Sequence, residues 1–146
     1  MRLKKEGVFS AMNDVILNKT TTIERCVKRI HEVYDGNPAN LTDFTKQDSI
    51  ILNIQRACEA SIDLAMHIVS ERKLGVPKAS REAFKLLLDA GIIENSLAKT
   101  LMNMVGFRNI AVHDYQQLDL NILKAILEKH IDDFKDFSKV ILQLEE

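Results

Sequence analysis

Apolar residues recur every three to four positions along most of the chain, which is the spacing of helices that bury one face. A first helix is predicted over residues 14–34, with apolar positions at Ile16, Ile23, Cys26, Val27, Ile30 and Tyr34. The Asp-Gly-Asn-Pro segment at residues 35–38 predicts its end, because these residues favour turns. A second helix over residues 46–73 is the longest and most apolar, so we expect it at the centre of the fold.

The second half of the chain predicts one short helix and two long ones. Residues 81–90 form the short helix, and Gly91 ends it. The next helix covers about residues 94–112, and the last covers residues 119–144. The apolar stripe of the last helix is Leu123, Leu127, His130, Phe134, Phe137 and Ile141. We therefore predict an all-α fold, an up-and-down bundle of four main helices plus a short one.

The amino-acid composition is consistent with a fold that has few connecting turns and a single hydrophobic core. The 146 residues include only 5 Gly and 2 Pro, too few for the many turns of a β-sandwich or barrel. A hydrophobic fraction of 46% is enough for one core at this length. Residues 1–11 show no clean period, so we expect a flexible N-terminal extension there and a single helical domain over residues 12–146.

The cellular location of the protein is predicted from its targeting signals, its apolar runs and its cysteines. The sequence shows no secretory leader and no apolar run near 18 residues. Cys26 and Cys58 both lie within apolar helical patterns, which is typical of reduced thiols. We expect a cytoplasmic protein with no membrane contact and no cofactor.

Charge limits the ways in which this chain can bind nucleic acid. The net charge is −1, so any such binding must use a local patch rather than a global basic field. The charge is unevenly spread: residues 1–34 hold seven Lys or Arg against four Asp or Glu, whereas residues 119–146 hold four against seven.

The most informative stretch is residues 105–115, Val-Gly-Phe-Arg-Asn-Ile-Ala-Val-His-Asp-Tyr. At about 100° per residue, Arg108 falls in the middle of the apolar stripe of its helix. A guanidinium there is costly unless it pairs with a buried carboxylate or a helix end, or faces a cleft. Gly106, Asn109 and His113 define a second face, where the glycine suggests close approach of a backbone or a ligand.

Arg108 and His113 are five residues apart, or about 140° around a regular helix. They cannot converge on one small group within a regular helix. Two alternatives remain open at this point. Either the helix unwinds near Val112, or two chains pair through this helix and share one cleft, which predicts a symmetric dimer.

The same stretch resembles a known motif. Residues 108–115 are similar to the Arg-x4-His-x-Tyr motif of HEPN-domain toxins of the HepT type. Residues 47–60, Gln-Asp-Ser-Ile-Ile-Leu-Asn-Ile-Gln-Arg-Ala-Cys-Glu-Ala, resemble the second helix of that family, and the helix order fits from about Met12 onward. The motif is fairly specific because Asn follows the arginine, Tyr comes two residues after the histidine, and the context is all helical.

The resemblance implies a function and a partner. It implies a metal-independent endoribonuclease, the toxin of a type VII toxin–antitoxin pair, acting as a homodimer. Its catalytic residues would be Arg108 and His113. It also implies a cognate MNT-type nucleotidyltransferase antitoxin that adenylylates the motif tyrosine, here Tyr115, and silences the toxin.

The residue types suit RNA cleavage. RNA carries its own nucleophile, the 2′-hydroxyl. A histidine such as His113 can accept that proton or protonate the leaving 5′-oxygen, and Arg108 can hold the pentacoordinate phosphorane through two donors. The expected product is a 2′,3′-cyclic phosphate, with Asn109 in a supporting role that orients the phosphate or His113.

A second polar set lies on the predicted central helix. Asn53, Arg56 and Asp63 fall on one side of it, and we consider them as lining of the RNA cleft, with Arg56 on a phosphate. The alternative is an ordinary solvated or salt-bridged face.

Two rival functions are weighed. His113-Asp114 is also the central dipeptide of metal-dependent HD phosphohydrolases, which would need His67 and Asp132 or Asp133 as further ligands. A non-enzymatic alternative is a helical subunit that binds a nucleotidyltransferase or its nucleotide. RNA cleavage by the purified protein, with Arg108→Ala and His113→Ala as controls, discriminates these alternatives.

Overall fold

The computed structural model describes the backbone of residues 2–145 and the side chains of residues 14–145. Within that range every regular element is helical, which confirms the all-α prediction. The long helices are α1 (Arg2–Tyr34), α2 (Phe44–Glu71), α4 (Asn95–His113) and α6 (Asp133–Leu144). The shorter elements are α3 (Ser80–Asp89), α5 (Leu120–Ala125), the 3₁₀ turns η1 (Pro38–Thr42) and η2 (Tyr115–Gln117), and a π-helical turn η3 (Ile126–His130).

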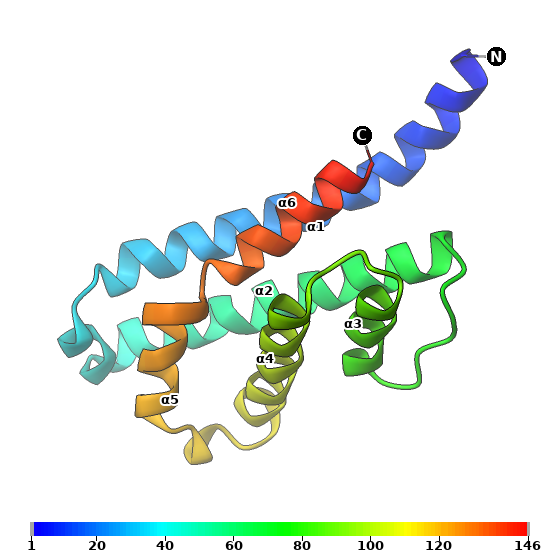
Figure 1. The fold of residues 1–146 in the computed structure, drawn as a ribbon. Helices are drawn as coiled ribbons and strands as arrows, with labels where there is room; N and C mark the ends of the chain where they lie inside the picture. Colours follow the sequence, from blue (N-terminus) through cyan, green and yellow to red (C-terminus); the bar gives the residue numbers. More distant parts are fainter. Residues whose placement is uncertain (1, 146) are drawn as a thin grey trace.

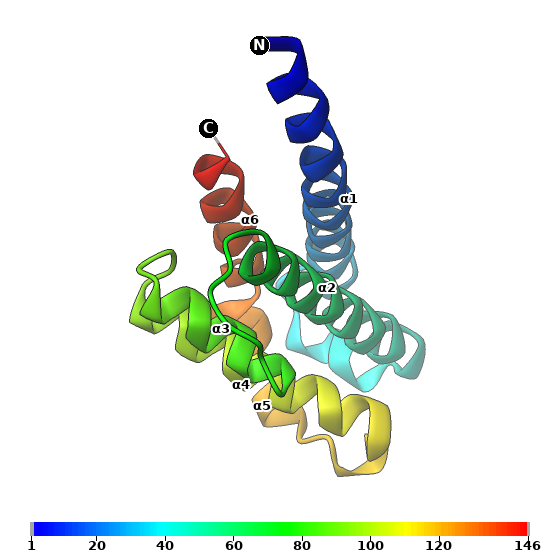
Figure 2. The ribbon, with the colours of Figure 1, turned by 90° about the vertical axis from the view of Figure 1, so that its right-hand side faces the viewer.

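Helix α2 is the centre of the bundle, as its apolar pattern predicts. Helices α1 and α6 lie on one side of it, and α3, α4 and α5 lie on the other (Figures 1 and 2). Ile50, Ile54 and Leu64 of α2 have no exposed surface. Burial of one such side chain stabilises the fold by about 1.5–3 kcal/mol, so α2 organises the core to which the other helices attach.

The first two helices are joined by a turn that the sequence predicts. Asp35 and Gly36 both adopt positive φ angles, 51° and 66°, which lets the chain reverse after Tyr34. Asp43 then caps α2, its side chain accepting the N–H of Lys46 at 3.1 Å. The expected helix over residues 14–34 is the C-terminal part of α1. The side chains of residues 1–11 lie outside the described residues, so the predicted extension remains a prediction.

The segment predicted as one helix over residues 119–144 is divided. Between α5 and α6 the π-helical turn η3 accommodates one more residue per turn than an α-helix, which advances the buried positions along the chain. Ile131, 3% exposed, therefore takes the core position expected for His130. The prediction for His130 is wrong: it is exposed, and its Nδ1 lies 3.2 Å from Oδ2 of Asp133.

Candidate functional site

The C-terminal half of α4 carries the motif residues on a regular helix. Helix α4 continues to His113, and the N–H of Asp114 still donates to the carbonyl of Ile110 at 2.8 Å. The alternative in which the helix unwinds near Val112 is therefore wrong. On a regular helix the side chains of Arg108 and His113 leave the axis about 140° apart.

Arg108 lies on the side of α4 that faces α2. Burial raises the pKa of the Cys58 thiol to about 12, and the nearby Arg108 guanidinium opposes this rise. The Nε of Arg108 is enclosed and has no hydrogen-bond partner, and the described side chains offer it no ion pair. The buried carboxylate considered as its partner is thus not found. An enclosed donor left without an acceptor costs about 1–3 kcal/mol, so this position needs an explanation other than stability.

Asn109, Val112 and His113 form the solvent-facing side of the end of α4. All three are exposed, and Val112 has 45% of its surface accessible. An imidazole and an amide therefore lie beside an exposed aliphatic side chain. This face presents groups that can contact a phosphodiester together with an apolar residue that a second protein surface could cover.

Tyr115 follows immediately in the turn η2 and has a defined partner. Its hydroxyl donates to Oδ1 of Asp48 near the start of α2. Burial, and to a smaller extent the hydrogen bond and negative charge of Asp48, together raise the pKa of Tyr115 to about 12. The phenol is therefore protonated at neutral pH and held in one orientation, while 41% of the residue remains accessible.

Gly106 is approached by a side chain rather than by a backbone. A Cβ atom at this position would lie 2.5 Å from a terminal nitrogen of Arg81, the second residue of α3. The sequence suggests a backbone or a ligand here, whereas the structure places the guanidinium of Arg81 there. Arg81 places a positive charge against the helix face that also bears Asn109 and His113.

The three predicted lining residues of α2 divide into two groups. Asn53 and Arg56 line a cavity of about 660 Å³ between α1 and α2. Asp63 does not line it: its Oδ2 lies 2.9 Å from the Nζ of Lys19. Only Asn53 and Arg56 are brought together in one depression.

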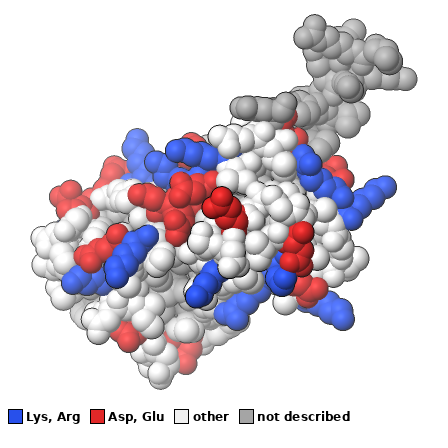
Figure 3. Space-filling view, in the orientation of Figure 1, with Lys and Arg blue, Asp and Glu red and all other residues white. Residues whose placement is uncertain are grey.

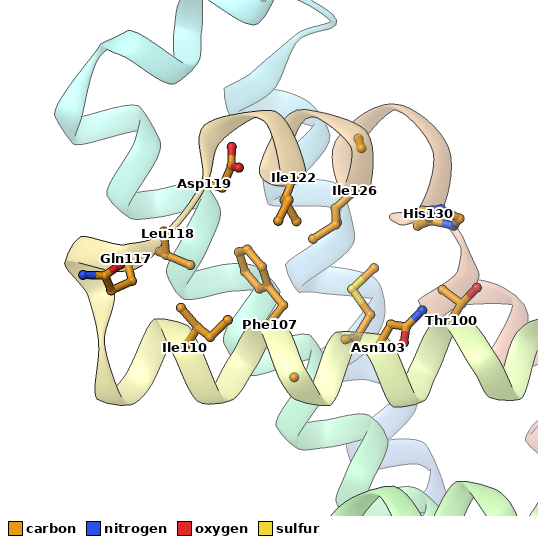
Figure 4. A pocket seen from close by; sticks show the side chains of 13 residues that line it. Thr100, Asn103, Phe107, Ile110, Gln117, Leu118, Asp119, Ile122, Ile126 and His130 are labelled. Carbon is orange, nitrogen blue, oxygen red and sulfur yellow. The ribbon is translucent and has the colours of Figure 1, made fainter.

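A second cavity, more apolar than the one between α1 and α2, lies elsewhere. It measures about 420 Å³ and lies between α4 and the α5 segment (Figure 4). Phe107, Ile110 and Ile122 point into it. Phe107 and Ile110 leave the helix axis about 100° and 160° away from Arg108, so the cavity opens mainly on another side of α4.

Charged side chains of both signs are interspersed on the face of the molecule seen in Figure 3. Acidic side chains gather where α6 begins, where Asp133 and Asp136 occupy the first turn. This view is consistent with the acidic excess of the C-terminal segment. It gives this face no broad positive field that would attract RNA.

The metal-dependent alternative receives no geometric support. Among the described residues, no three His, Cys, Asp or Glu side chains gather closely enough to hold a metal ion. Asp132 instead lies 2.8 Å from Nε2 of His31, and Asp133 contacts His130.

Among the residues that the structure describes, none of the helices combines the length and hydropathy needed to cross a membrane.

The sequence did not reveal two neighbours of the motif. Asp48 and Tyr115 are 67 residues apart, and nothing in the local pattern of α2 marks Asp48 as the partner of a tyrosine. Arg81 begins a short amphipathic helix and has the pattern of an ordinary surface residue. Contacts of this kind depend on how helices pack, which periodicity alone does not determine.

The fold and the motif define a class of ribonuclease. Residues 23–141 match a family described as ribonuclease HepT-like, which spans most of the chain. The protein therefore belongs to the HepT-like ribonuclease family.

Its relatives agree with this assignment. The chain is 51% identical over 130 residues to the mRNA nuclease HepT of Shewanella oneidensis, covering 89% of this chain and 98% of that protein. It is 35% identical over 81 residues to the tRNA nuclease HepT of Aphanizomenon flos-aquae, covering 56% and 55%. Among solved structures it matches the tri-AMPylated HEPN toxin of S. oneidensis in complex with an MNT antitoxin. That match has a TM-score of 0.84 and 50% identity, and it covers 89% and 98% of the two chains.

Proposed function

We propose that this chain is the toxin of a type VII toxin–antitoxin pair, an endoribonuclease that a cognate MNT-type nucleotidyltransferase silences by adenylylating Tyr115. Family membership supports the nuclease activity, and the AMPylated state of the S. oneidensis relative supports the mode of silencing. The observation that carries the proposal for this chain's own residues is the enclosed Nε of Arg108, which has no acceptor within the described part of the protein.

Arg108 is the residue that stabilises the transition state. Its guanidinium is permanently charged and planar, and it offers donors to two oxygens of one phosphoryl group. Because no described carboxylate neutralises it, its charge remains available to the phosphodiester. The terminal nitrogens of this guanidinium can donate to the phosphorane as negative charge develops there.

His113 moves the protons. The 2′-oxygen of the ribose attacks the adjacent phosphorus, its proton passes to an imidazole, and the bond to the 5′-oxygen breaks as that oxygen is protonated. The products are a 2′,3′-cyclic phosphate and a 5′-hydroxyl. Asn109, one turn from His113 on the exposed face of α4, supports the reaction by orienting the phosphate or the imidazole.

The active form is a homodimer through the end of α4. Arg108 and His113 diverge on one regular helix, and Val112 lies exposed beside them. A second copy related by a two-fold axis would cover Val112 and bring the arginine of one chain toward the histidine of the other. The helix geometry thus favours the dimer of the two alternatives raised by the sequence.

Tyr115 is the site of control. Its hydroxyl oxygen attacks the α-phosphorus of a nucleoside triphosphate held by the partner, pyrophosphate leaves, and the phenolic proton passes to a base. Asp48 already accepts that proton in a hydrogen bond, and 41% of Tyr115 is accessible to the partner. An AMP group two residues beyond His113 adds a phosphate and a base at the entrance of the cleft, which excludes substrate.

Purified protein tests the nuclease. Wild type is incubated with a defined single-stranded RNA in excess chelator, beside Arg108→Ala and His113→Ala. We expect wild-type cleavage to yield 2′,3′-cyclic phosphate ends and each variant to lose at least about 100-fold in rate, the scale of one catalytic acid–base group. Equal cleavage by both variants would remove these residues from the reaction and favour a contaminating nuclease.

The same variants discriminate the binding-subunit alternative. If wild type does not cleave RNA but binds the nucleotidyltransferase, the chain is a helical docking subunit. Growth arrest on expression, relieved by His113→Ala or by co-expression of the nucleotidyltransferase, is the result expected of a toxin.

A further inference from the structure

A positively charged groove lies between α1 and α2, beside the motif site. Its volume is about 660 Å³, and its walls include Arg25 and Arg29 of α1 and Arg56 of α2. Among the described residues the only carboxylate that lines it is Asp48, which accepts the Tyr115 hydroxyl. Three guanidinium groups therefore face one carboxylate in a depression of a protein whose net charge is −1.

Within the described part of the protein, the three arginines have no charge partners. All three are exposed, and among the described side chains none of them forms an ion pair. Arg25 and Arg29 are four residues apart on one helix face, an arrangement of like charges that destabilises a helix by about 0.2–0.5 kcal/mol. Structure alone gives no reason for this arrangement, whereas a polyanion in the groove would compensate all three charges.

Cys26 shows that the two walls converge. Burial raises the pKa of this thiol, and the charges of Arg56 and Arg25 both oppose the rise. The guanidinium from α2 and the one from α1 thus both act on a side chain that lies in the groove between them. Helices α1 and α2 lie side by side along this region in both ribbon views (Figures 1 and 2).

The groove meets the motif segment at Asp48. Asp48 lines its end and also accepts the hydroxyl of Tyr115, which is two residues beyond His113. From Asp48 to Arg56 the groove follows α2 for about 12 Å, and Arg25 and Arg29 are about 6 Å apart along α1. A chain of phosphates leaving the end of α4 would meet the three arginines in succession.

We propose that this groove binds the sugar–phosphate backbone of the RNA strand next to the bond that is cut, with Arg25, Arg29 and Arg56 on phosphates and Asn53 as an additional hydrogen-bond donor. The proposal rests on the proposed nuclease function and extends it from α4 to α1. Because the net charge is only −1, RNA binding needs a local basic patch, and this groove provides one. The groove also assigns a role to two of the basic residues in the positively charged segment 1–34.

Single-stranded RNA fits this groove better than an acidic protein surface does. Guanidinium groups spaced along the groove match repeated phosphates, and the Ser49 hydroxyl and the second N–H of the Asn53 amide can donate to them. The Thr22 hydroxyl donates to the carbonyl of Asn18 and can accept from a ribose hydroxyl. A protein surface would also need apolar contact area, and of the side chains that the structure describes, Leu52 is the one exposed large apolar residue that lines the groove.

Binding to a cleavage-resistant probe tests the proposal. A fluorescein-labelled single-stranded RNA with 2′-O-methyl riboses cannot react, so wild-type protein can be titrated by anisotropy over a range of salt concentrations. We expect Arg25→Gln/Arg29→Gln to weaken binding about tenfold or more and to reduce the slope of log affinity against log salt by about 1.4, or about 0.7 per lost phosphate contact.

Two further variants make the result specific. Arg56→Gln, on the opposite wall, should weaken binding and reduce the slope by about half as much. Lys135→Gln/Lys139→Gln removes the same charge from another exposed pair of basic residues four apart, on α6 and outside the groove, and should bind as wild type does. Circular dichroism of each variant checks that it is folded.

The outcomes separate this proposal from the nuclease itself. If wild type cleaves ordinary RNA while the groove variants bind the probe as tightly as the α6 control, the groove proposal is wrong and the nuclease stands. If the variants instead lose affinity only for the nucleotidyltransferase, the groove docks protein and the proposal also fails. If neither wild type nor any variant cleaves RNA, the proposed function fails. The anisotropy titration still tests whether the groove binds the RNA backbone.

Discussion

Arg108 near the end of α4 and Tyr115 in the following turn η2 lie seven residues apart, but their polar groups differ in hydrogen bonding. The hydroxyl of Tyr115 has an acceptor in Asp48, whereas the Nε of Arg108 is enclosed without one. A satisfied group can remain as it is until a partner modifies it, but an unsatisfied cation attracts an anion. This contrast fits a site in which Arg108 acts on substrate and Tyr115 is held ready for modification.

The partner of Tyr115 leads to a prediction about pH. Asp48→Asn removes a negative charge and keeps a side chain of the same shape, so the pKa of Tyr115 should fall from about 12 toward the ordinary value near 10. It should remain somewhat raised, because burial, the larger cause, is unchanged. Absorbance titration of the phenolate measures the shift, with Tyr115→Phe to separate the signal from that of Tyr34.

Linkage fixes the sign of the effect on stability. A phenol whose pKa is raised by folding contributes stability below its unfolded pKa, and this contribution is lost as pH rises from about 10 through about 12. The fall in the free energy of unfolding across this window should therefore be smaller in Asp48→Asn than in wild type. An identical titration of Tyr115 in both proteins would mean that Asp48 is not its partner in solution.

At the scale of the helices, the sequence predicts what depends on local pattern. The limits of α2 and α4 follow from apolar periodicity and turn residues, and Arg108 is conspicuous because it interrupts an apolar stripe. The π-helical turn η3 is not predicted, because the same periodicity fits an unbroken helix until the packing of Ile131 selects the register.

The site is predicted less completely than the fold for the same reason. A motif on one helix is a local feature and can be recognised in the chain. The contact of Asp48 with Tyr115 and the convergence of Arg25 with Arg56 require α1, α2 and α4 to be packed together. Such arrangements exist only in the tertiary structure.

Gly106 allows a test at the level of α4. Alanine there would raise helix propensity by up to about 1 kcal/mol, while its Cβ would displace the end of the flexible Arg81 side chain. We expect Gly106→Ala to leave the free energy of unfolding unchanged or to raise it by less than about 1 kcal/mol. Chemical denaturation measures this, and a loss of more than about 1 kcal/mol would show that Arg81 is fixed in place.

At the scale of the whole molecule, one chain carries both Arg108 and His113 but does not bring their side chains together. Arg108 points toward α2, whereas His113 and Asn109 lie on the solvent face of α4. A second copy supplies the simplest way to bring one arginine and one histidine to the same phosphate. We therefore propose that the dimer forms the active site and that its entrance lies at Tyr115, where an AMP group would close it.

Mixing two inactive variants tests this claim most directly. Arg108→Ala and His113→Ala proteins are purified separately, mixed under conditions that allow subunits to exchange, and assayed for cleavage of a defined RNA. If each site takes its arginine from one chain and its histidine from the other, half of the dimers become mixed and each mixed dimer holds one intact site. We therefore expect about a quarter of wild-type activity to return. A mixture that exchanges subunits, as followed by mass spectrometry, yet stays as inactive as its components would contradict the shared site.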